Sequence, residues 1–295
     1  MTPLETHLGL KVEAVNRELA TLLPGGNGPE RKLYEAMRYA TLNGGKRLRP
    51  FLVISSAQLF DVAERHALRV AAAVELVHCY SLVHDDLPAM DDDDLRRGLP
   101  TCHVKFDEAT AILAGDGLLT LAFAVLSAPE THPDAEVRCA LVRGLSEASG
   151  ALGMVGGQMF DLEAERVRLD LDAVTRLQQL KTGALFTFCC EAGAVLGRAP
   201  EAAHRALRAY AKDLGLAFQI ADDLLDEEGT EREVGKKVGK DAAQGKATFV
   251  SLLGAGGARA RARELAGRAA KQLDLFGAKA ELLAELARFV VERRT

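Results

Sequence analysis

Apolar residues recur every three or four positions through most of the chain, and this spacing places them on one face of an α-helix. The periodic stretches are rich in alanine, leucine, glutamate and arginine, whereas runs of β-branched residues with strict alternation are absent. The pattern predicts helices over residues 4–22, 30–43, 48–60, 64–86, 107–127, 135–150, 152–167, 173–196 and 201–226, with two or three more after residue 247. The chain is therefore predicted to be all-α.

Turn-forming residues separate the predicted helices. The run Pro24–Pro29 stops the first helix, a loop covers Arg96–Thr101, and a loop rich in glycine and lysine covers residues 227–247. Asp172 is a suitable N-cap for the helix predicted over residues 173–196.

Composition and charge are those of an ordinary soluble globular protein. The 295 residues are 48% hydrophobic and 27% charged, with a net charge of −5. The apolar content is sufficient for a large core, and the mild acidity argues against a nucleic-acid surface, which needs a basic face. No linker or change in composition divides the chain, so we predict that residues 1–295 form a single all-α domain. No run of about 18 residues lacks charged and polar groups, so no membrane span is expected.

Cysteine usage indicates a reducing compartment. The five cysteines are Cys79, Cys102, Cys139, Cys189 and Cys190, and no two of them form a C-x-x-C pair. An odd number without such pairs argues against structural zinc and against a disulfide framework. Reduced thiols in a cytoplasmic protein fit best, and the N-terminal residues lack the features of a signal peptide.

The most unusual stretch runs from His84 to Asp94, where six aspartates fall within ten residues. Carboxylates this close repel one another, but Mg²⁺ binds through one or two carboxylates, usually together with substrate phosphates. Asp85 and Asp91 are six positions apart, which is out of phase for a regular helix. Because Pro88 loosens the turn, a distorted helix end is predicted to bring Asp91 back beside Asp85. For a lone acidic run, a solvated loop is the alternative.

A second acidic cluster, Asp222-Asp223-Leu224-Leu225-Asp226, also ends an apolar helix. Its three aspartates are spaced i, i+1 and i+4, so they project from one face. Two such clusters at the ends of two helices can face one cavity and share metal ions. The pair therefore favours metal binding over a solvated loop.

Basic residues gather in four further places. Gly44–Pro50 (GGKRLRP) sets three cationic side chains beside a glycine turn, where backbone N–H groups can approach an anion. Arg96 and Arg97 follow the acidic run, and Lys181-Thr182-Gly183 interrupts an apolar helix. The fourth group lies in the loop after the second acidic cluster and comprises Lys236, Lys237, Lys240 and Lys246. This distribution predicts two phosphate-bearing groups, of which only one is held through metal.

These motifs together resemble those of the short-chain trans-prenyl diphosphate synthases, and most closely the bacterial farnesyl diphosphate synthases (geranyltranstransferases). Asp85–Asp91 is similar to the family's first aspartate-rich motif in its bacterial form, and Asp222–Asp226 to its DDxxD motif. GGKRLRP, DDLRRG, GGQ, KTG and FQIADD also have counterparts in the family, in the same order from about residue 30 onwards. The resemblance implies a helical bundle around a central cavity, Mg²⁺ dependence with three ions and Mn²⁺ as a substitute, and a homodimer.

The resemblance also implies a role for individual residues. Asp85 and Asp91 would ligate two Mg²⁺ ions and Asp222 a third, with Asp86 and Asp226 in support. The allylic diphosphate would be held by Arg96, Lys181 and the 236–246 loop, in which Lys236 and Lys246 are the expected contacts; whether Lys236 or Lys237 contacts the diphosphate is open. The diphosphate of isopentenyl diphosphate would be held without metal by Lys46, Arg49, His78 and Arg97. Lys181, Thr182 and Gln219 would lie near the ionising carbon, and Gln158, Asp161 and Phe218 would line the cavity.

Product length depends on the floor of that cavity. Tyr80 and Ser81 lie five and four residues before Asp85 on the same helix, about one turn below the metal site. A bulky Tyr80 resembles the floor of synthases that stop at fifteen carbons, whereas small residues allow longer chains. The alternative makes Tyr80 a plain core residue.

The implied activity is condensation of isopentenyl diphosphate with dimethylallyl and then geranyl diphosphate, to give farnesyl diphosphate. A geranyl or geranylgeranyl diphosphate synthase is the nearest alternative. A terpene cyclase would not need a second diphosphate site, and a non-catalytic helical subunit would be expected to have lost aspartates or lysines that are present here.

Overall fold

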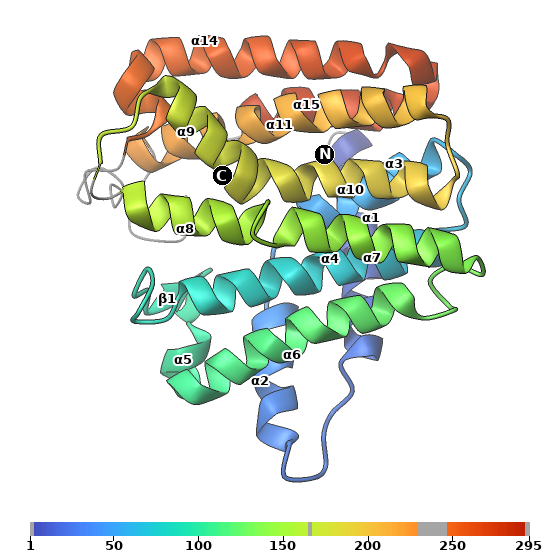
Figure 1. The fold of residues 1–295 in the computed structure, drawn as a ribbon, viewed down its shortest axis with the longest axis vertical. Coiled ribbons are helices and arrows are strands. Elements are labelled where there is room, and N and C mark those ends of the chain that lie inside the picture. The colour runs from blue at the N-terminus through green and yellow to red at the C-terminus, as the bar shows by residue number, and fades with distance from the viewer. Residues whose placement is uncertain (1–2, 165–166, 229–246, 293–295) are drawn as a thin grey trace. The chain divides into compact units, whose positions relative to one another are not determined.

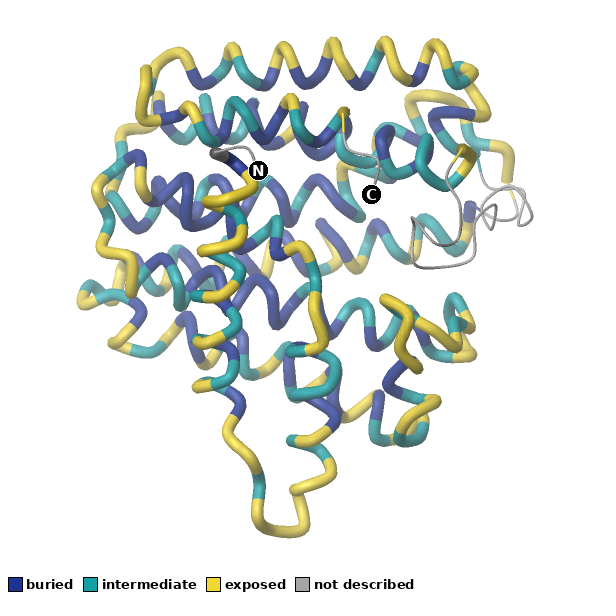
Figure 2. Tube along the Cα trace, turned by 180° about the vertical axis from the view of Figure 1, so that it is seen from behind, coloured by how far each residue is buried: buried dark blue, intermediate teal, exposed yellow. Residues whose placement is uncertain are grey.

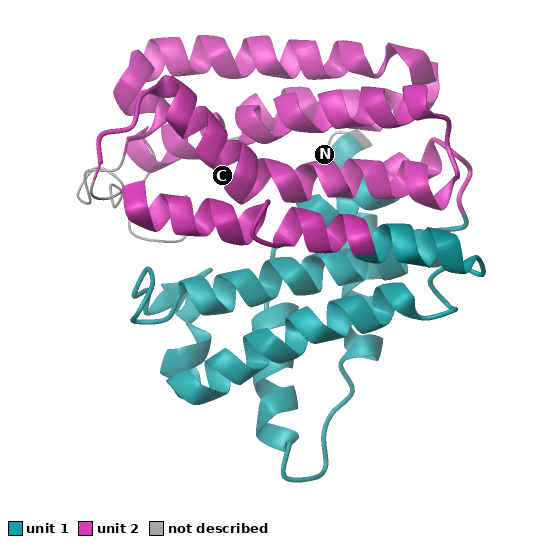
Figure 3. Ribbon diagram, in the orientation of Figure 1, with its two compact units in different colours: residues 1–54, 63–142 teal, residues 55–62, 143–295 magenta. Residues whose placement is uncertain are grey.

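The computed structural model describes residues 3–164, 167–228 and 247–292, and these are almost entirely helical (Figure 1). The described chain forms two compact units, residues 1–54 with 63–142 and residues 55–62 with 143–295 (Figure 3). The all-α fold predicted from the sequence is confirmed.

Unit 1 is built around two long helices that pack against each other. Its elements are α1 (Pro3–Leu22), α2 (Arg31–Leu42), most of α3 (Leu48–Gln58), α4 (Glu64–Asp85), α5 (Cys102–Lys105), α6 (Glu108–Ser127) and the first half of α7 (Ala135–Ser149). α4 is buried along almost its whole length and packs against α6, with α1 and α2 alongside. At their crossing Gly115 of α6 makes room for His84, because a Cβ there would lie 2.1 Å from Nε2 of the histidine. The C-terminal end of α4 is therefore held at a fixed place.

Unit 2 contains the remaining helices. They are α8 (Met154–Ala164), α9 (Leu171–Gln178), the π-helical turn η1 (Gln179–Gly183), α10 (Ala184–Leu196), α11 (Glu201–Glu228), α14 (Phe249–Gln272), the 3₁₀ turn η2 (Asp274–Ala280) and α15 (Glu281–Glu292). α11 packs against α10, α14 and α15. α14 buries Ala258, Ala262 and Leu265 and exposes the opposite face (Figure 2). The hydroxyl of Tyr210 on α11 donates to the carbonyl oxygen of Leu283 at 2.8 Å, which ties α11 to α15.

The structure differs from the sequence-based expectation in three local respects. Asp170, not Asp172, caps α9: its carboxylate accepts from the N–H of Ala173, so the helix begins two residues earlier than predicted. The helix predicted over residues 173–196 is also not uniform, because η1 inserts a π-helical turn between α9 and α10. Between α4 and α5, two residue pairs of the predicted loop form a short antiparallel hairpin, β1 (Leu95–Arg96) with β2 (Leu99–Pro100).

Among the described helices, α6 alone is long and apolar enough to cross a membrane by length and composition. One face of it, with Ala111, Ala114 and Leu118, is fully buried within unit 1. All five cysteines lie in the described part of the chain, and each is a free thiol.

Candidate active site

The acidic run forms a tight turn at the end of α4. The backbone N–H of Asp91 donates to the carbonyl oxygen of Asp85 at 2.8 Å, and that of Asp93 donates to the carbonyl of Asp86. Asp92 adopts a left-handed conformation, with φ of 50°, which lets the chain reverse over so short a span. The turn confirms that Asp91 comes back beside Asp85, as the position of Pro88 predicts.

Asp86 points inward and pairs with Arg96. Only 2% of Asp86 is exposed, and its two carboxylate oxygens accept from Nε of Arg96 at 2.7 and 3.0 Å. Burial is the largest single influence and would lower the pKa of Arg96, but the hydrogen bond to Asp86 together with the charges of Asp86, Asp93 and Asp85 raises that pKa overall. Such a bidentate pair fixes the guanidinium in position. Asp86 thus orients the arginine that follows the acidic turn.

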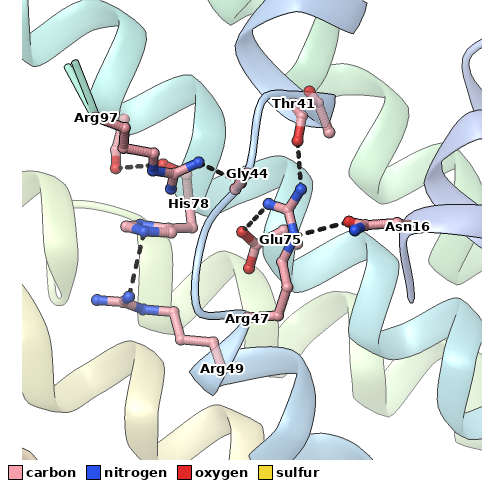
Figure 4. Close-up of polar contacts among 9 residues, drawn as sticks. Asn16, Thr41, Gly44, Arg47, Arg49, Glu75, His78 and Arg97 are labelled. Atoms are coloured by element: carbon pink, nitrogen blue, oxygen red, sulfur yellow. Dashed lines mark hydrogen bonds and ion pairs between the residues drawn. The ribbon is translucent and has the colours of Figure 1, made fainter. Parts of the chain in front are cut away.

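The basic loop of unit 1 is held by backbone contacts that require glycine (Figure 4). Gly44 and Gly45 have φ of 81° and 121°, values that favour glycine. The guanidinium of Arg97 donates to the carbonyl oxygen of Gly44, and a Cβ on Gly45 would lie 2.9 Å from that guanidinium. Arg97, from the hairpin, is therefore brought against the loop that carries Lys46 and leads into α3, where Arg49 lies.

Arg47 has a different role from the two cations beside it in the sequence. It is only 3% exposed, and its Nη1 donates to Glu75 of α4 at 2.6 Å (Figure 4). Its remaining donors reach Oδ1 of Asn16 at 3.0 Å and the carbonyl oxygen of Thr41 at 2.6 Å. Arg47 therefore anchors the loop, and its charge is used inside the fold and not for an anion. Sequence reasoning missed Glu75, although a single carboxylate in the otherwise apolar stretch Val70–Val77 is a signal of a buried partner.

His78 lies one turn after Glu75 and faces the same loop. Its Nε2 is 3.4 Å from Nη1 of Arg49 (Figure 4). Burial, followed by the nearby Arg49, Arg97, Arg96 and Arg47, holds the pKa of His78 well below its usual range. The ring is therefore neutral. Its Nε2 accepts a hydrogen bond from Arg49, and the other ring nitrogen, Nδ1, carries the proton. Arg49, His78 and Arg97 gather around one loop.

A pocket with about 420 Å³ of space, part of it open to solvent, lies beside this region of unit 1. Its polar lining includes Tyr39, Asp86, Arg96, Arg97 and Thr101.

In unit 2, Lys181 lies on the π-helical turn. Its Nζ pairs with Oδ2 of Asp161 on α8 at 2.7 Å. Gly157 permits the close approach of α8, since a Cβ there would lie 2.2 Å from the backbone nitrogen of Lys181. Both polar atoms of the buried Gln158 side chain lack a hydrogen-bond partner among the described residues. Turns of π-helix are frequent at functional sites, and this one carries two of the predicted site residues, Lys181 and Thr182. Asp161, which pairs with Lys181, and Gln158 lie on the neighbouring α8.

A second polar group of unit 2 surrounds Gln219 of α11. Its Oε1 accepts from the hydroxyl of Thr182 at 3.3 Å, and its Nε2 donates to Oδ1 of Asp223 at 3.0 Å. Asp223 is 6% exposed, and its Oδ2 accepts from the backbone N–H of Phe249 at 3.0 Å. Asp223 is thus used inside the fold, while Asp222 beside it is half-buried.

Tyr80 is buried on α4, and its ring packs edge-to-face on His84, with centroids 5.7 Å apart. Burial, with a smaller effect of Asp85, raises the pKa of Tyr80 to about 12, so the phenol stays neutral. The hydroxyl of Ser81 donates to the carbonyl oxygen of His78 at 2.9 Å. Phe218 packs on Phe186 in unit 2, with centroids 5.2 Å apart.

The donors present suit a hard divalent cation. Carboxylate oxygens are the ligands that Mg²⁺ prefers, and the turn brings Asp85 and Asp91 together. Oδ1 of Asp226 is buried without a hydrogen-bond partner in the described chain. Within the same residues no three metal-ligating side chains converge. Lys236, Lys237 and Lys246 lie outside the described residues.

Comparison with known proteins gives a consistent result. The polyprenyl synthetase family profile matches residues 30–281. The farnesyl diphosphate synthase of Escherichia coli strain K12 is 47% identical over 286 residues, covering 95% of this chain and 94% of that enzyme. An FPP/GFPP synthase from Zymomonas mobilis superposes with a TM-score of 0.90 at 50% identity, with 98% of each chain covered. The geranyltransferase of Helicobacter pylori, solved with magnesium and isoprenyl diphosphate, has a TM-score of 0.85 at 31% identity, covering 99% of this chain and 97% of that one.

Proposed function

This chain belongs to the polyprenyl synthetase family, and from that premise we propose that it is a farnesyl diphosphate synthase. It condenses isopentenyl diphosphate with dimethylallyl diphosphate and then with geranyl diphosphate. The observation that carries the proposal lies in unit 1. There the aspartate turn of Asp85 and Asp91 and the basic group of Arg49, His78 and Arg97 are both present. Two diphosphates held in two different ways are what this condensation needs.

The allylic diphosphate is assigned to the acidic turn. Magnesium, three ions per site with Mn²⁺ as a substitute, would neutralise the charge of the leaving diphosphate. Asp85, Asp91 and Asp222 are the proposed ligands, with Asp226 in support. Asp86 acts through Arg96, because its carboxylate is already bound to that guanidinium.

Arg96 and Lys181 contribute positive charge to the allylic diphosphate. Arg96 is oriented for this by Asp86, and Lys181 rests on Asp161 until the substrate competes for its ammonium group. Lysines of the 236–246 segment, Lys236 and Lys246, complete this group in the proposal. Charges that are already in place stabilise the anion as the C–O bond breaks, without reorganisation at that moment.

Isopentenyl diphosphate is assigned to the basic loop. Lys46, Arg49, His78 and Arg97 bind its diphosphate directly, and the neutral His78 orients Arg49. Cleavage of the allylic C–O bond sends the electron pair to the diphosphate and leaves a positively charged carbon. The oxygen atoms of Thr182 and Gln219 stabilise that charge, and the double bond of isopentenyl diphosphate then attacks it. Loss of a proton to the released pyrophosphate completes the step.

The protein is proposed to act as a cytoplasmic homodimer. Exposed apolar side chains support this: Ile112 and Leu113 on α6 are 44% and 57% exposed. In unit 2, Val155 and Met159 of α8 are 48% and 56% exposed. Apolar side chains gathered in this way on a helix surface are typical of a protein interface.

A longer product is the second candidate function, because the similar structure from Zymomonas mobilis is described as an FPP/GFPP synthase. One assay separates the candidates: the protein is incubated with Mg²⁺, isopentenyl diphosphate and each allylic primer, and the products are sized. Fifteen-carbon product from both dimethylallyl and geranyl primers is expected. Products of ten, twenty or more carbons would reassign the chain length, and no condensation with any primer would overturn the proposal.

A further inference from the structure

A chain of hydrogen bonds in unit 2 connects the start of α14 to the π-helical turn. The N–H of Phe249 donates to one oxygen of Asp223, and the other oxygen accepts from Nε2 of Gln219 at 3.0 Å. Oε1 of the same amide accepts from the hydroxyl of Thr182 at 3.3 Å. Three elements, η1, α11 and α14, thus meet at one amide.

This network determines which way the Gln219 amide points. A carboxylate only accepts hydrogen bonds, so the group that faces Asp223 must be the NH₂ of Gln219. Amide orientation is properly assigned from such a network, and here the assignment has a single solution. The oxygen of Gln219 is left on the side of Thr182.

Packing keeps the three elements in register. A Cβ on Gly215 would lie 3.3 Å from Cα of Gly183, so α11 approaches η1 closely just before Gln219. On the other side Phe249 is 3% exposed, and Thr248 forms a capping box with Ser251 at the start of α14. The N–H that holds Asp223 therefore belongs to a well-anchored helix end.

We propose that Asp223 is a positioning residue, which orients the Gln219 amide so that its oxygen, not its NH₂ group, faces the carbon that ionises. The inference rests on the proposed function, since it concerns the carbocation of that reaction. A carbonyl dipole pointing at a developing positive charge lowers the barrier, whereas an NH₂ group in the same place raises it. Asp223 thereby differs from Asp222 beside it, which is the proposed metal ligand.

The variant Asp223→Asn tests this orientation directly. The N–H of Phe249 still needs an acceptor, so the asparagine oxygen turns to it and the asparagine NH₂ faces Gln219. Gln219 must then reverse its amide and present NH₂ towards Thr182. We expect kcat to fall about 10²-fold, the size of effect for one misplaced dipole, while KM for either substrate changes less than about twofold.

Binding of a cationic analogue provides a readout independent of turnover. The probe is an allylic diphosphate analogue with a tertiary ammonium at the ionising carbon, compared with an uncharged analogue of the same shape. Because it resembles the transition state, the cationic probe should bind Asp223→Asn at least about tenfold more weakly. The uncharged probe should bind the variant and the parent equally.

A second substitution should restore the orientation. In Asp223→Asn with Gln219→Glu, the glutamate accepts from the asparagine NH₂ with one oxygen and from Thr182 with the other. We expect this double variant, which keeps the same total charge, to recover affinity for the cationic probe. Protection of the Phe249 amide from hydrogen exchange should persist in both variants, since an acceptor is retained.

Three results would overturn the inference: equal affinity of parent and Asp223→Asn for the cationic probe, equal weakening of both probes, or no recovery in the double variant. A raised Mg²⁺ requirement, like that expected for Asp222→Asn, would assign Asp223 to the metal instead. Failure of the parent protein to condense its substrates is a separate outcome, which overturns the proposed function together with this inference.

Discussion

The guanidinium of Arg47 lies 2.6 Å from the carboxylate of Glu75, and both side chains are almost fully buried. Arg47 follows the glycine turn with φ of 49°, so the pair fixes a strained backbone as well as a charge. The loop that presents Lys46 and Arg49 is consequently attached to α4, the helix that carries His78 and ends at the acidic turn.

Glu75→Gln should strongly destabilise the protein. It leaves the Arg47 charge buried without its counter-charge, which costs roughly 3 to 5 kcal/mol. The free energy of unfolding from denaturant titration measures this. The matched control is Asp61→Asn, which removes the carboxylate of the exposed pair with Lys279 and should cost less than about 1 kcal/mol. Similar losses in the two variants would contradict the anchoring role of Glu75.

Acidification should destabilise the protein through His78. Its pKa is well below the usual range in the folded state and about 6.5 in the unfolded state. As pH falls below about 6.5, the unfolded chain gains a proton that the folded protein excludes, so stability present at pH 7 is lost. Denaturant titrations at pH 7.5 and 5.5 should give a smaller loss for His78→Gln than for the parent. The prediction fails if both proteins lose stability equally.

Tyr80→Ala should lengthen the product. Removing the ring that packs on His84 opens space about one turn below the acidic turn, so condensation is expected to continue beyond fifteen carbons. Tyr80→Phe keeps the ring and should leave the product length unchanged. Sizing of products from the three proteins checks this, and an unchanged spectrum for Tyr80→Ala would reduce Tyr80 to a core residue.

Leu113→Glu should weaken self-association. Leu113 is 57% exposed on α6, and a charge buried in an interface without a partner is costly. Light scattering of the purified protein should give a dimer for the parent and a shift towards monomer for the variant. Leu275, which is 63% exposed on η2, provides the control, Leu275→Glu. A monomeric parent would contradict the homodimer.

The sequence was sufficient to predict the all-α fold and most helix positions, because helix-favouring residues dominate, strand-like alternation is absent and turn-forming residues separate the segments. It could not predict the π-helical turn at Lys181, because α10, which follows the turn, is apolar on nearly every side and does not show the rotation that one extra residue causes. The hairpin at Arg96 and Leu99 was also missed, because two residues per strand produce no alternation.

The sequence predicted which residues make up the candidate site better than it predicted the contacts between them. The position of Pro88 predicted that Asp91 lies beside Asp85, and the hydrogen bond between their backbones confirms it. Charge pattern alone could not separate Arg47 from Lys46 and Arg49, since three adjacent cations look alike until a buried partner such as Glu75 is known. The inward position of Asp86 likewise depends on Arg96, whose pairing arises from the tertiary fold.

The central claim is that this protein holds its two diphosphates by different means, one through metal at the acidic turn and one directly at the basic loop. The most direct test measures initial rates while the concentrations of both substrates and of Mg²⁺ are varied. It compares the parent with Arg49→Met and Asp91→Asn. Arg49→Met should raise KM for isopentenyl diphosphate at least about tenfold, the loss of one charged hydrogen bond, and leave the allylic KM and the Mg²⁺ requirement unchanged. Asp91→Asn should raise the Mg²⁺ requirement and the allylic KM instead. Equal effects of both variants on both substrates would contradict the claim.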